Sequence, residues 1–182
     1  MSTLGASPSD NGRGSESWYR SWTHLSVDRR SAGYCRVTFD HPPINTITAT
    51  TVEELIEVVD LIEQDRDLNV VVFDSANPDV YLADYDAEHD PGRSAWLDVL
   101  GRLSRAPVVN IASVRGRAGG AGSEFVLACD LRFASRENTP LGEFEVGTVV
   151  VADDQLDDEV DQIASRLARF DHEAPARTLP DA

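Results

Sequence analysis

Hydrophobic residues follow two different patterns along the chain. Continuous apolar runs at residues 69–74 (NVVVFD) and 108–114 (VVNIASV) are typical of strands that are buried on both faces of a sheet. Between these runs, apolar residues recur at helical spacing over residues 95–104. The same spacing follows Thr50 and returns over residues 154–170. This alternation of strands with helices predicts an α/β domain.

Turn and capping signals set the limits of several elements. Two strand patterns, at residues 22–28 and 34–40, flank a turn at residues 29–33 and predict a hairpin. Thr50 and Glu53 have the spacing of a helix capping box, so we expect the first helix to begin there.

The chain is predicted to have three parts. Residues 1–17 are rich in Ser, Gly and Asp, which is typical of a disordered tail. Residues 18–151 are expected to form the α/β core, with a short helix at residues 125–129 and a further strand at residues 131–134. Residues 152–182 are expected to form an amphipathic C-terminal helix and a tail, and Asp residues crowd the first turn of that helix.

The composition argues against several classes of protein. The 182 residues carry 16 basic and 32 acidic side chains, and every basic one is an Arg. The net charge of −16 repels nucleic acid and opposes an anionic ligand unless Arg residues cluster. No apolar stretch reaches the ~20 residues that span a bilayer, and the N-terminus lacks a secretory pattern. We therefore expect a cytoplasmic protein without nucleic-acid or membrane partners.

The residues that commonly bind metals or form disulfides give no such signal. Cys35 and Cys129 lie among small or strand-forming residues and are predicted to be buried, reduced thiols. The four His residues lack metal-ligand spacing, so no metal site is expected.

A glycine-rich segment, GRAGGAGSEFVLACD at residues 116–130, carries the candidate chemistry. Its four glycines permit close backbone approach to a ligand and expose amides at the start of a helix. Glu124 lies among small and apolar neighbours, where a charged group is rarely placed unless it is paired or functional. A tight turn, with a Glu that serves only the helix dipole, explains the segment equally well. The segment is neither a P-loop nor a dinucleotide fingerprint.

The same segment resembles the signature of the enoyl-CoA hydratase/isomerase (crotonase) family. In this resemblance Glu124 matches one catalytic glutamate, and the backbone N–H of Ala121 matches one half of the oxyanion hole. The stretch LGEFEVG at residues 141–147 is similar to a later family motif. It places Glu145 at the second catalytic glutamate, with Phe144 in place of the usual proline.

Upstream, VYLADYDA at residues 80–87 resembles the family segment that completes the oxyanion hole. Ala83 matches the residue that donates the second amide. Asp84 and Tyr85 depart from the small residues expected after it, and an acid that pointed inward would oppose a developing oxyanion. An ordinary loop after the strand at residues 69–74 is an equal alternative.

The matches run in the family's order from residue 22 to residue 147, and they include DHPPINTI at residues 40–47. They imply a crotonase-like (ClpP/crotonase) spiral of ββα units with a truncated C-terminal helical region, because family members continue with several helices after Glu145. Loss of those helices would expose apolar surface, so we expect either a homo-oligomer or a marginally stable chain. The residues that the resemblance places at the substrate are Gly120, Gly122 and Tyr85.

The activity implied by the resemblance is hydration of a 2-enoyl-CoA thioester of fatty acid metabolism, with coenzyme A as part of the substrate and no separate cofactor. The thioester oxygen would bind the amides of Ala83 and Ala121, while Glu124 and Glu145 transfer protons. Enoyl-CoA isomerisation, which often needs one carboxylate, is a second reading. A third is a non-catalytic acyl-CoA-binding or interaction protein, which Asp84, the net charge and the shortened C-terminal region favour.

Overall fold

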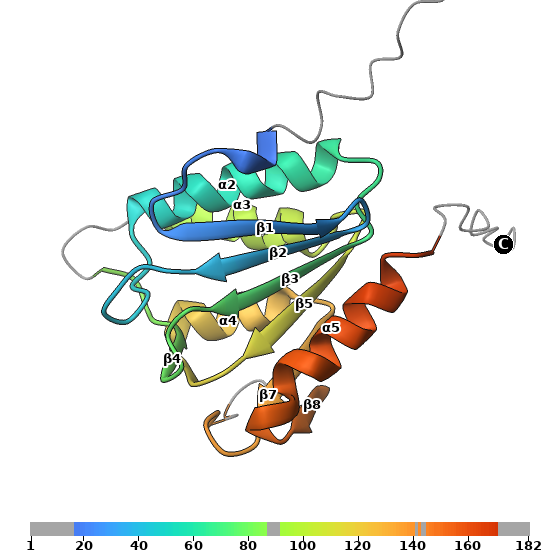
Figure 1. Cartoon of the computed structure of the whole chain (residues 1–182). Helices are drawn as coiled ribbons and strands as arrows, with labels where there is room; N and C mark the ends of the chain where they lie inside the picture. Colours follow the sequence, from blue (N-terminus) through green and yellow to red (C-terminus); the bar gives the residue numbers. More distant parts are fainter. Residues whose placement is uncertain (1–16, 87–91, 141, 143–144, 171–182) are drawn as a thin grey trace, which may run out of the picture.

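A mostly parallel sheet of six strands forms the centre of the molecule (Figure 1). The computed structural model describes residues 17–86, 92–140, 142 and 145–170. The strand order is β1-β2-β3-β5-β7-β8, with β1 antiparallel to β2 and the other neighbouring pairs parallel. Two short strands, β4 and β6, pair with each other in a second sheet. The strands are β1 (Leu25–Ser31), β2 (Tyr34–Phe39), β3 (Val70–Ser75), β4 (Val80–Leu82), β5 (Val109–Val114), β6 (Arg117–Ala118), β7 (Leu131–Ser135) and β8 (Thr148–Val151).

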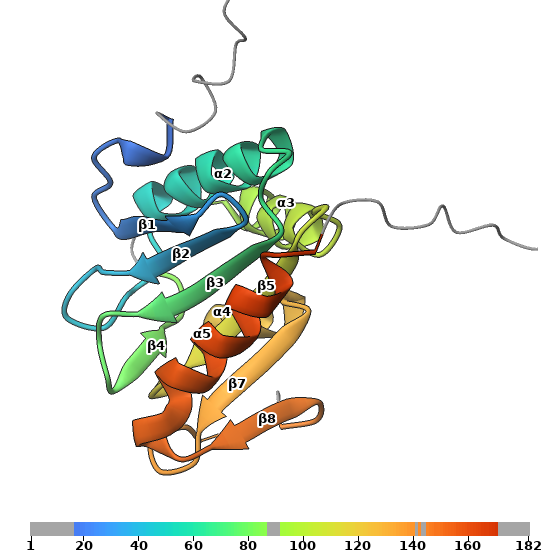
Figure 2. The ribbon, with the colours of Figure 1, turned by 45° about the vertical axis from the view of Figure 1, so that its right-hand side comes forward.

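Helices cover both faces of the large sheet, as Figures 1 and 2 show. On one face lie α2 (Ala49–Gln64), α3 (Arg93–Leu103) and α4 (Gly120–Ala128), whose buried side chains form one core with the sheet. On the other face lies α5 (Leu156–Leu167), which packs against β3, β5 and β7. Two 3-10 turns, η1 (Ser17–Tyr19) and η3 (Asp153–Gln155), precede β1 and α5.

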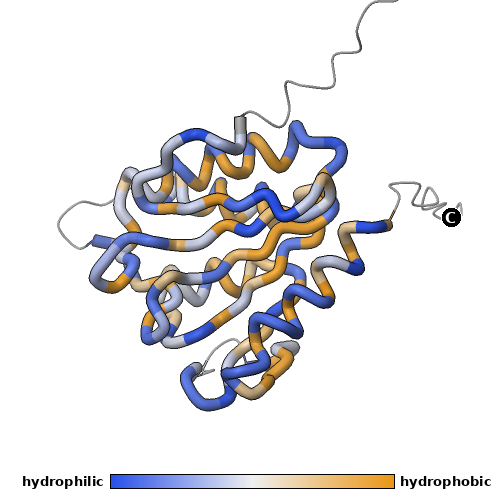
Figure 3. The backbone as a smooth tube through the Cα atoms, in the orientation of Figure 1, coloured by the Kyte–Doolittle hydropathy of each residue, from blue (hydrophilic) through white to orange (hydrophobic). Residues whose placement is uncertain are grey.

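The apolar run of β3 contributes to both cores. Val71 and Phe73 belong to the cluster under α2, α3 and α4, whereas Val70 and Val72 belong to the cluster under α5. Successive side chains of a strand point to opposite faces, so a strand covered on both sides is apolar at every position. In Figure 3 the hydrophobic colour runs through the first part of this strand and gives way to a hydrophilic colour at its end, where the sequence has Asp74 and Ser75. The prediction of a strand buried on both faces is confirmed.

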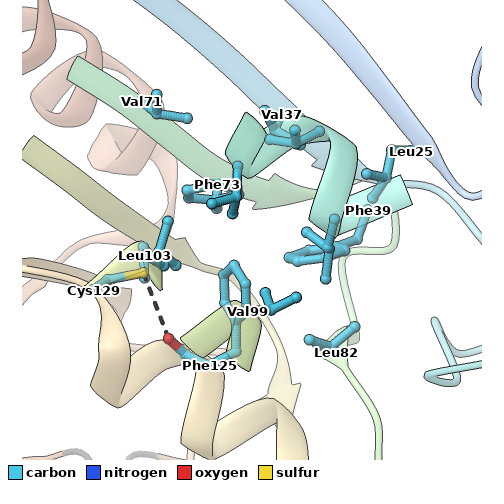
Figure 4. Packing of buried hydrophobic residues seen from close by; sticks show 14 of the residues in the cluster. Leu25, Val37, Phe39, Val71, Phe73, Leu82, Val99, Leu103, Phe125 and Cys129 are labelled. Atoms are coloured by element: carbon cyan, nitrogen blue, oxygen red, sulfur yellow. Dashed lines mark hydrogen bonds between the residues drawn. The ribbon is translucent and has the colours of Figure 1, made fainter. Parts of the chain in front are cut away.

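A cluster of aromatic rings fixes α4 to the sheet and to α3 (Figure 4). The ring of Phe125 lies edge-on to Phe39 at a centroid distance of 5.3 Å and to Phe73 at 5.1 Å. It also contacts the ring of Trp96 from α3 at 6.0 Å. Such contacts contribute roughly 0.5–1.5 kcal/mol each beyond area burial. The ring of Phe125 therefore holds α4 against the sheet and against α3.

The predicted α/β fold class is confirmed, while some element limits differ. The hairpin is present as β1 and β2, but β1 extends through Ser31 and the turn is shorter than predicted. Helix α2 begins at Ala49 because Thr48, not Thr50, is the N-cap, and the capping box joins Thr48 to Thr51. Because Thr48, Thr50 and Thr51 all lie at the start of this helix, the sequence alone does not decide which of them is the N-cap.

Further differences concern the later elements of the chain. Helix α4 begins at Gly120, whereas the sequence predicted a helix only from residue 125. Strand β8 was not predicted, and it adds an edge to the sheet beside β7. The last helix was predicted over residues 154–170 and is observed as η3 followed by α5. The predicted N-terminal tail lies outside the described residues, apart from Ser17.

Both cysteines are buried and unpaired, as predicted. Burial raises the pKa of the Cys35 thiol to about 12, so this group stays protonated at neutral pH. The thiol of Cys129 lies 3.5 Å from the carbonyl oxygen of Phe125, the contact drawn in Figure 4.

Among the described residues, no helix combines the length and the apolar character needed to cross a membrane.

Candidate active site

The start of α4 offers backbone amides that have no acceptor within the helix. Gly119 is the N-cap residue, and glycine has no side-chain oxygen that could cap the helix. Gly120 follows with φ of +37°, a left-handed value that glycine adopts most easily. The N–H groups of a first helical turn lack intrahelical partners and carry the positive end of the helix dipole. Ala121 lies in this turn, so its N–H is suited to bind a negatively charged oxygen.

The chain that follows β4 lies directly against this helix start. A Cβ atom at Gly122 would lie 2.2 Å from the carbonyl oxygen of Leu82, so only glycine permits the observed backbone contact. The N–H of Gly119 also donates to the Leu82 carbonyl at 3.1 Å. Main-chain contacts thus fix α4 against the end of β4. The contact with Leu82 is enough to require glycine at 122, whether or not a ligand binds. The expected contact of Gly122 with substrate stays a prediction.

Two backbone amides from these segments converge on one oxygen atom. The Oδ1 atom of Asp84 accepts the N–H of Tyr85 at 2.8 Å and the N–H of Ala121 at 3.3 Å. We call the N–H groups of Tyr85 and Ala121 the amide pair. Two donors aimed at a single oxygen are the arrangement that stabilises an oxyanion. In this structure the oxygen belongs to the chain itself.

The amide of Ala83, which the sequence assigned to the oxyanion hole, has a different partner. Its N–H donates to the carbonyl oxygen of Asn45 at 3.1 Å. An N–H committed to a protein carbonyl is not available to a substrate oxygen, so the assignment of Ala83 does not fit this geometry. Tyr85, predicted only as a substrate contact, provides the amide that meets Ala121.

The segment that carries Tyr85 is held by the chain before α2. Ile47 donates its N–H to the Asp84 carbonyl at 3.2 Å and accepts the N–H of Asp86 at 3.0 Å, so a parallel bridge pairs Ile47 with Tyr85. The Tyr85 ring is half-buried and lies edge-on to Trp96 at 6.0 Å. These contacts orient the Tyr85 amide toward α4.

Glu124 lies one turn further along α4 and has two partners from α3. The indole N–H of Trp96 donates to its Oε2 atom at 3.0 Å, and the Arg93 guanidinium lies 3.6 Å from its Oε1 atom. The Glu124 side chain is 38% exposed and that of Arg93 is 65% exposed, so this ion pair contributes little to stability. The fully buried Trp96 is the more rigid anchor. The carboxylate is therefore oriented but still accessible to solvent.

Glu145 lies in the turn before β8 and is exposed. Its carbonyl accepts the N–H of Thr148 at 3.2 Å. The preceding Phe144 lies outside the described residues. The pairing of Glu145 with Glu124 stays a prediction. Within the described ranges, no group of three or more His, Cys, Asp or Glu side chains is arranged to hold a metal ion.

Comparison with known proteins identifies the class of protein that this fold and site define. The sequence pattern described as enoyl-CoA hydratase/isomerase matches residues 29–153, and the chain belongs to this family. The match begins within β1, ends after β8, and includes both segments that form the amide pair. The predicted crotonase-like fold is thereby confirmed.

Solved structures give the same result. A Streptomyces avermitilis protein assigned as an enoyl-CoA hydratase has a TM-score of 0.74 and 28% identity, over 84% of this chain and 74% of that one. An enoyl-CoA hydratase from Bacillus anthracis has a TM-score of 0.69 and 19% identity, over 80% of this chain and 77% of that one. One from Mycobacterium smegmatis has a TM-score of 0.70 and 23% identity, over 80% and 77%. The last two likenesses concern the fold alone.

Proposed function

We propose that this chain binds the thioester of a 2-enoyl-CoA at the amide pair and hydrates its double bond. The observation that carries the proposal is the convergence of the Tyr85 and Ala121 amides on one negatively charged oxygen. The carboxylate oxygen of Asp84 takes the position that the thioester oxygen would occupy. A site that holds a full negative charge on that oxygen is suited to the enolate that forms during hydration.

The reaction divides between the backbone and the carboxylates. As water adds to the β-carbon, electrons move to the thioester oxygen, where the two amides stabilise the charge. A carboxylate accepts the proton of the attacking water, and a carboxylic acid delivers a proton to the α-carbon, which restores the thioester. Glu124 is the acid–base residue that the structure supports best, because α4 carries both Glu124 and Ala121. Glu145 is proposed as the second proton carrier on the family likeness alone.

Substitution of Glu124 by Gln tests the reaction. The variant keeps a side-chain oxygen to accept from Trp96 but cannot transfer a proton, so kcat for crotonyl-CoA hydration should fall by about 10²–10⁴-fold. Loss of the conjugated thioester absorbance measures the rate. Glu159→Gln is the matched control, because Glu159 is exposed on α5 across the sheet, and its rate should equal that of the parent chain. Equal rates for the Glu124 variant and the parent chain would refute the role of Glu124.

A second candidate is an acyl-CoA-binding protein that does not turn over its ligand. The seated Asp84 carboxylate and the exposed Glu145 favour it. Butyryl-CoA binding by calorimetry, combined with unchanged crotonyl-CoA absorbance at high protein concentration, would select this function over hydration. Conversion of a 3-enoyl-CoA to its 2-enoyl isomer in the same assay would instead select isomerisation, which needs only one proton-transferring carboxylate.

A further inference from the structure

We propose that Asp84 is an internal ligand of the amide pair and that an acyl-CoA thioester binds only after this carboxylate has left. The inference rests on the proposed function, since it concerns access to the same two amides. It adds a residue that sets the apparent affinity of the chain for thioesters.

The Asp84 carboxylate occupies the space next to the first residues of α4. Its Oδ1 atom accepts both N–H groups of the amide pair. Its Oδ2 atom lies only 2.2 Å from the position that a Cβ atom at Gly120 would take, so the carboxylate packs directly against this glycine. A thioester oxygen and the Asp84 carboxylate therefore cannot share the amide pair. Because an anion at a helix N-terminus is favoured by the helix dipole, the seated carboxylate competes more strongly than a neutral carbonyl would.

The side chain can nevertheless leave without unfolding the site. Asp84 is exposed, and its backbone carbonyl accepts the N–H of Ile47 at 3.2 Å, a contact that does not involve its side chain. Rotation of the carboxylate into solvent exposes both amides and leaves the main chain unchanged. If the carboxylate is seated in about 90–99% of molecules, the apparent affinity for a thioester falls by about 10–100-fold relative to an open site.

Substitution of Asp84 by Ala measures this competition. The variant should bind butyryl-CoA, which has no double bond to hydrate, at least tenfold more tightly than the parent chain in calorimetry. Free coenzyme A lacks the thioester carbonyl, so its affinity should not change. Asp84→Asn keeps an oxygen acceptor but loses the charge, and its gain should be smaller than that of Asp84→Ala.

Two controls separate the competition from charge and from folding. Asp98→Asn removes one negative charge at an exposed position of α3 and should leave butyryl-CoA affinity unchanged. Circular dichroism confirms that each variant is folded.

The outcomes distinguish the inference from the proposed function. Equal butyryl-CoA affinities for the parent chain and Asp84→Ala would overturn the inference and leave the proposed function standing. A gain that extends equally to free coenzyme A, or that Asp98→Asn reproduces, would show a general charge effect and would also overturn the inference. Absence of butyryl-CoA binding by both folded proteins would defeat the proposed function and the inference together.

Discussion

The imidazole rings of His24 and His41 are stacked 3.6 Å apart with an angle of 11° between their planes. His24 is half-buried, and its Nδ1 atom lies 2.9 Å from the Thr51 hydroxyl. Burial, followed by the neighbouring His41, lowers the pKa of His24 below its usual 6.5, although the Glu54 carboxylate acts in the opposite direction. The folded chain therefore favours the neutral form of this ring.

The stability of the chain should depend on pH through His24. Between its lowered folded pKa and about 6.5, the unfolded chain binds more protons at His24 than the folded chain does. The free energy of unfolding should therefore fall as pH drops below about 6.5 and recover as pH rises. Urea titrations at several pH values should show that His24→Gln flattens this part of the curve. An unchanged slope in the variant would contradict the assignment.

Single residues also show what the sequence could predict about the site. Ala121 and Glu124 were assigned from the resemblance of one continuous glycine-rich segment to a family signature, and their roles stay predictions. The choice between Ala83 and Tyr85 depends on which N–H the Asn45 carbonyl accepts, and Asn45 is distant in sequence. The motif contains no information on this contact, so the motif alone could not resolve the choice.

At the scale of elements, the contact between β4 and α4 determines where the helix begins. Four glycines near residue 120 argued against a helix there, because glycine disfavours helix interiors. The fold reverses this preference, since Gly122 lets the helix approach the backbone of Leu82. A preference of about 1 kcal/mol per residue is easily outweighed by tertiary contacts. The early start of α4 therefore could not be read from local sequence.

Substitution of Gly122 by Ala should have an effect opposite to that expected from helix propensity. Alanine is the better helix former, but its Cβ would overlap the Leu82 carbonyl at 2.2 Å. We expect a loss of about 1–3 kcal/mol in the free energy of unfolding and weaker acyl-CoA binding, because the amide pair is displaced. Urea denaturation and butyryl-CoA calorimetry measure the two effects.

Gly101 in α3 is the matched control for this substitution. Its added Cβ would meet only the end of the flexible Arg105 side chain, at 3.3 Å. Gly101→Ala should therefore raise stability by up to about 1 kcal/mol, as helix propensity predicts. A similar gain for Gly122→Ala would show that the contact between α4 and β4 does not restrict the residue at 122.

At the scale of the whole molecule, α5 covers a face that loss of later helices was expected to expose. Leu156, Val160 and Ala164 are fully buried on the sheet. Arg115, which follows β5, pairs with acidic residues of η3 and of the first turn of α5: it lies 2.9 Å from Asp153 and 3.3 Å from Asp157. Ion pairs with Arg115 therefore help to fix η3 and the start of α5 beside the sheet.

The far edge of the sheet is less well covered. Among the described elements, β8 has β7 as its only neighbour, and Leu131 and Val149 are 37% and 49% exposed. Exposed apolar side chains beside an open strand edge favour association of two copies. Homo-oligomerisation through this edge is accordingly a proposal that rests on exposure and strand order.

Light scattering after size exclusion should give a mass at least twice the 19.9 kDa of one chain. Val149→Arg places a charge on β8 and should reduce the mass to that of one chain. Val146→Arg is the control, because Val146 is 89% exposed in the turn before β8 and its substitution should not alter the mass. A parent chain that elutes as a monomer and melts cooperatively at high temperature would contradict the proposal.

The order in which the elements lie along the chain has a consequence for synthesis. Helix α5 is the last described element, yet it lies across strands made earlier (Figure 2). Its buried side chains share a cluster with Tyr34, Val72 and Phe133 of those strands. Domains begin to fold during translation, at roughly 5–20 residues per second. We expect a sheet that forms during translation to carry one bare apolar face until α5 emerges, and this face to expose the nascent chain to chaperones and to aggregation during that interval.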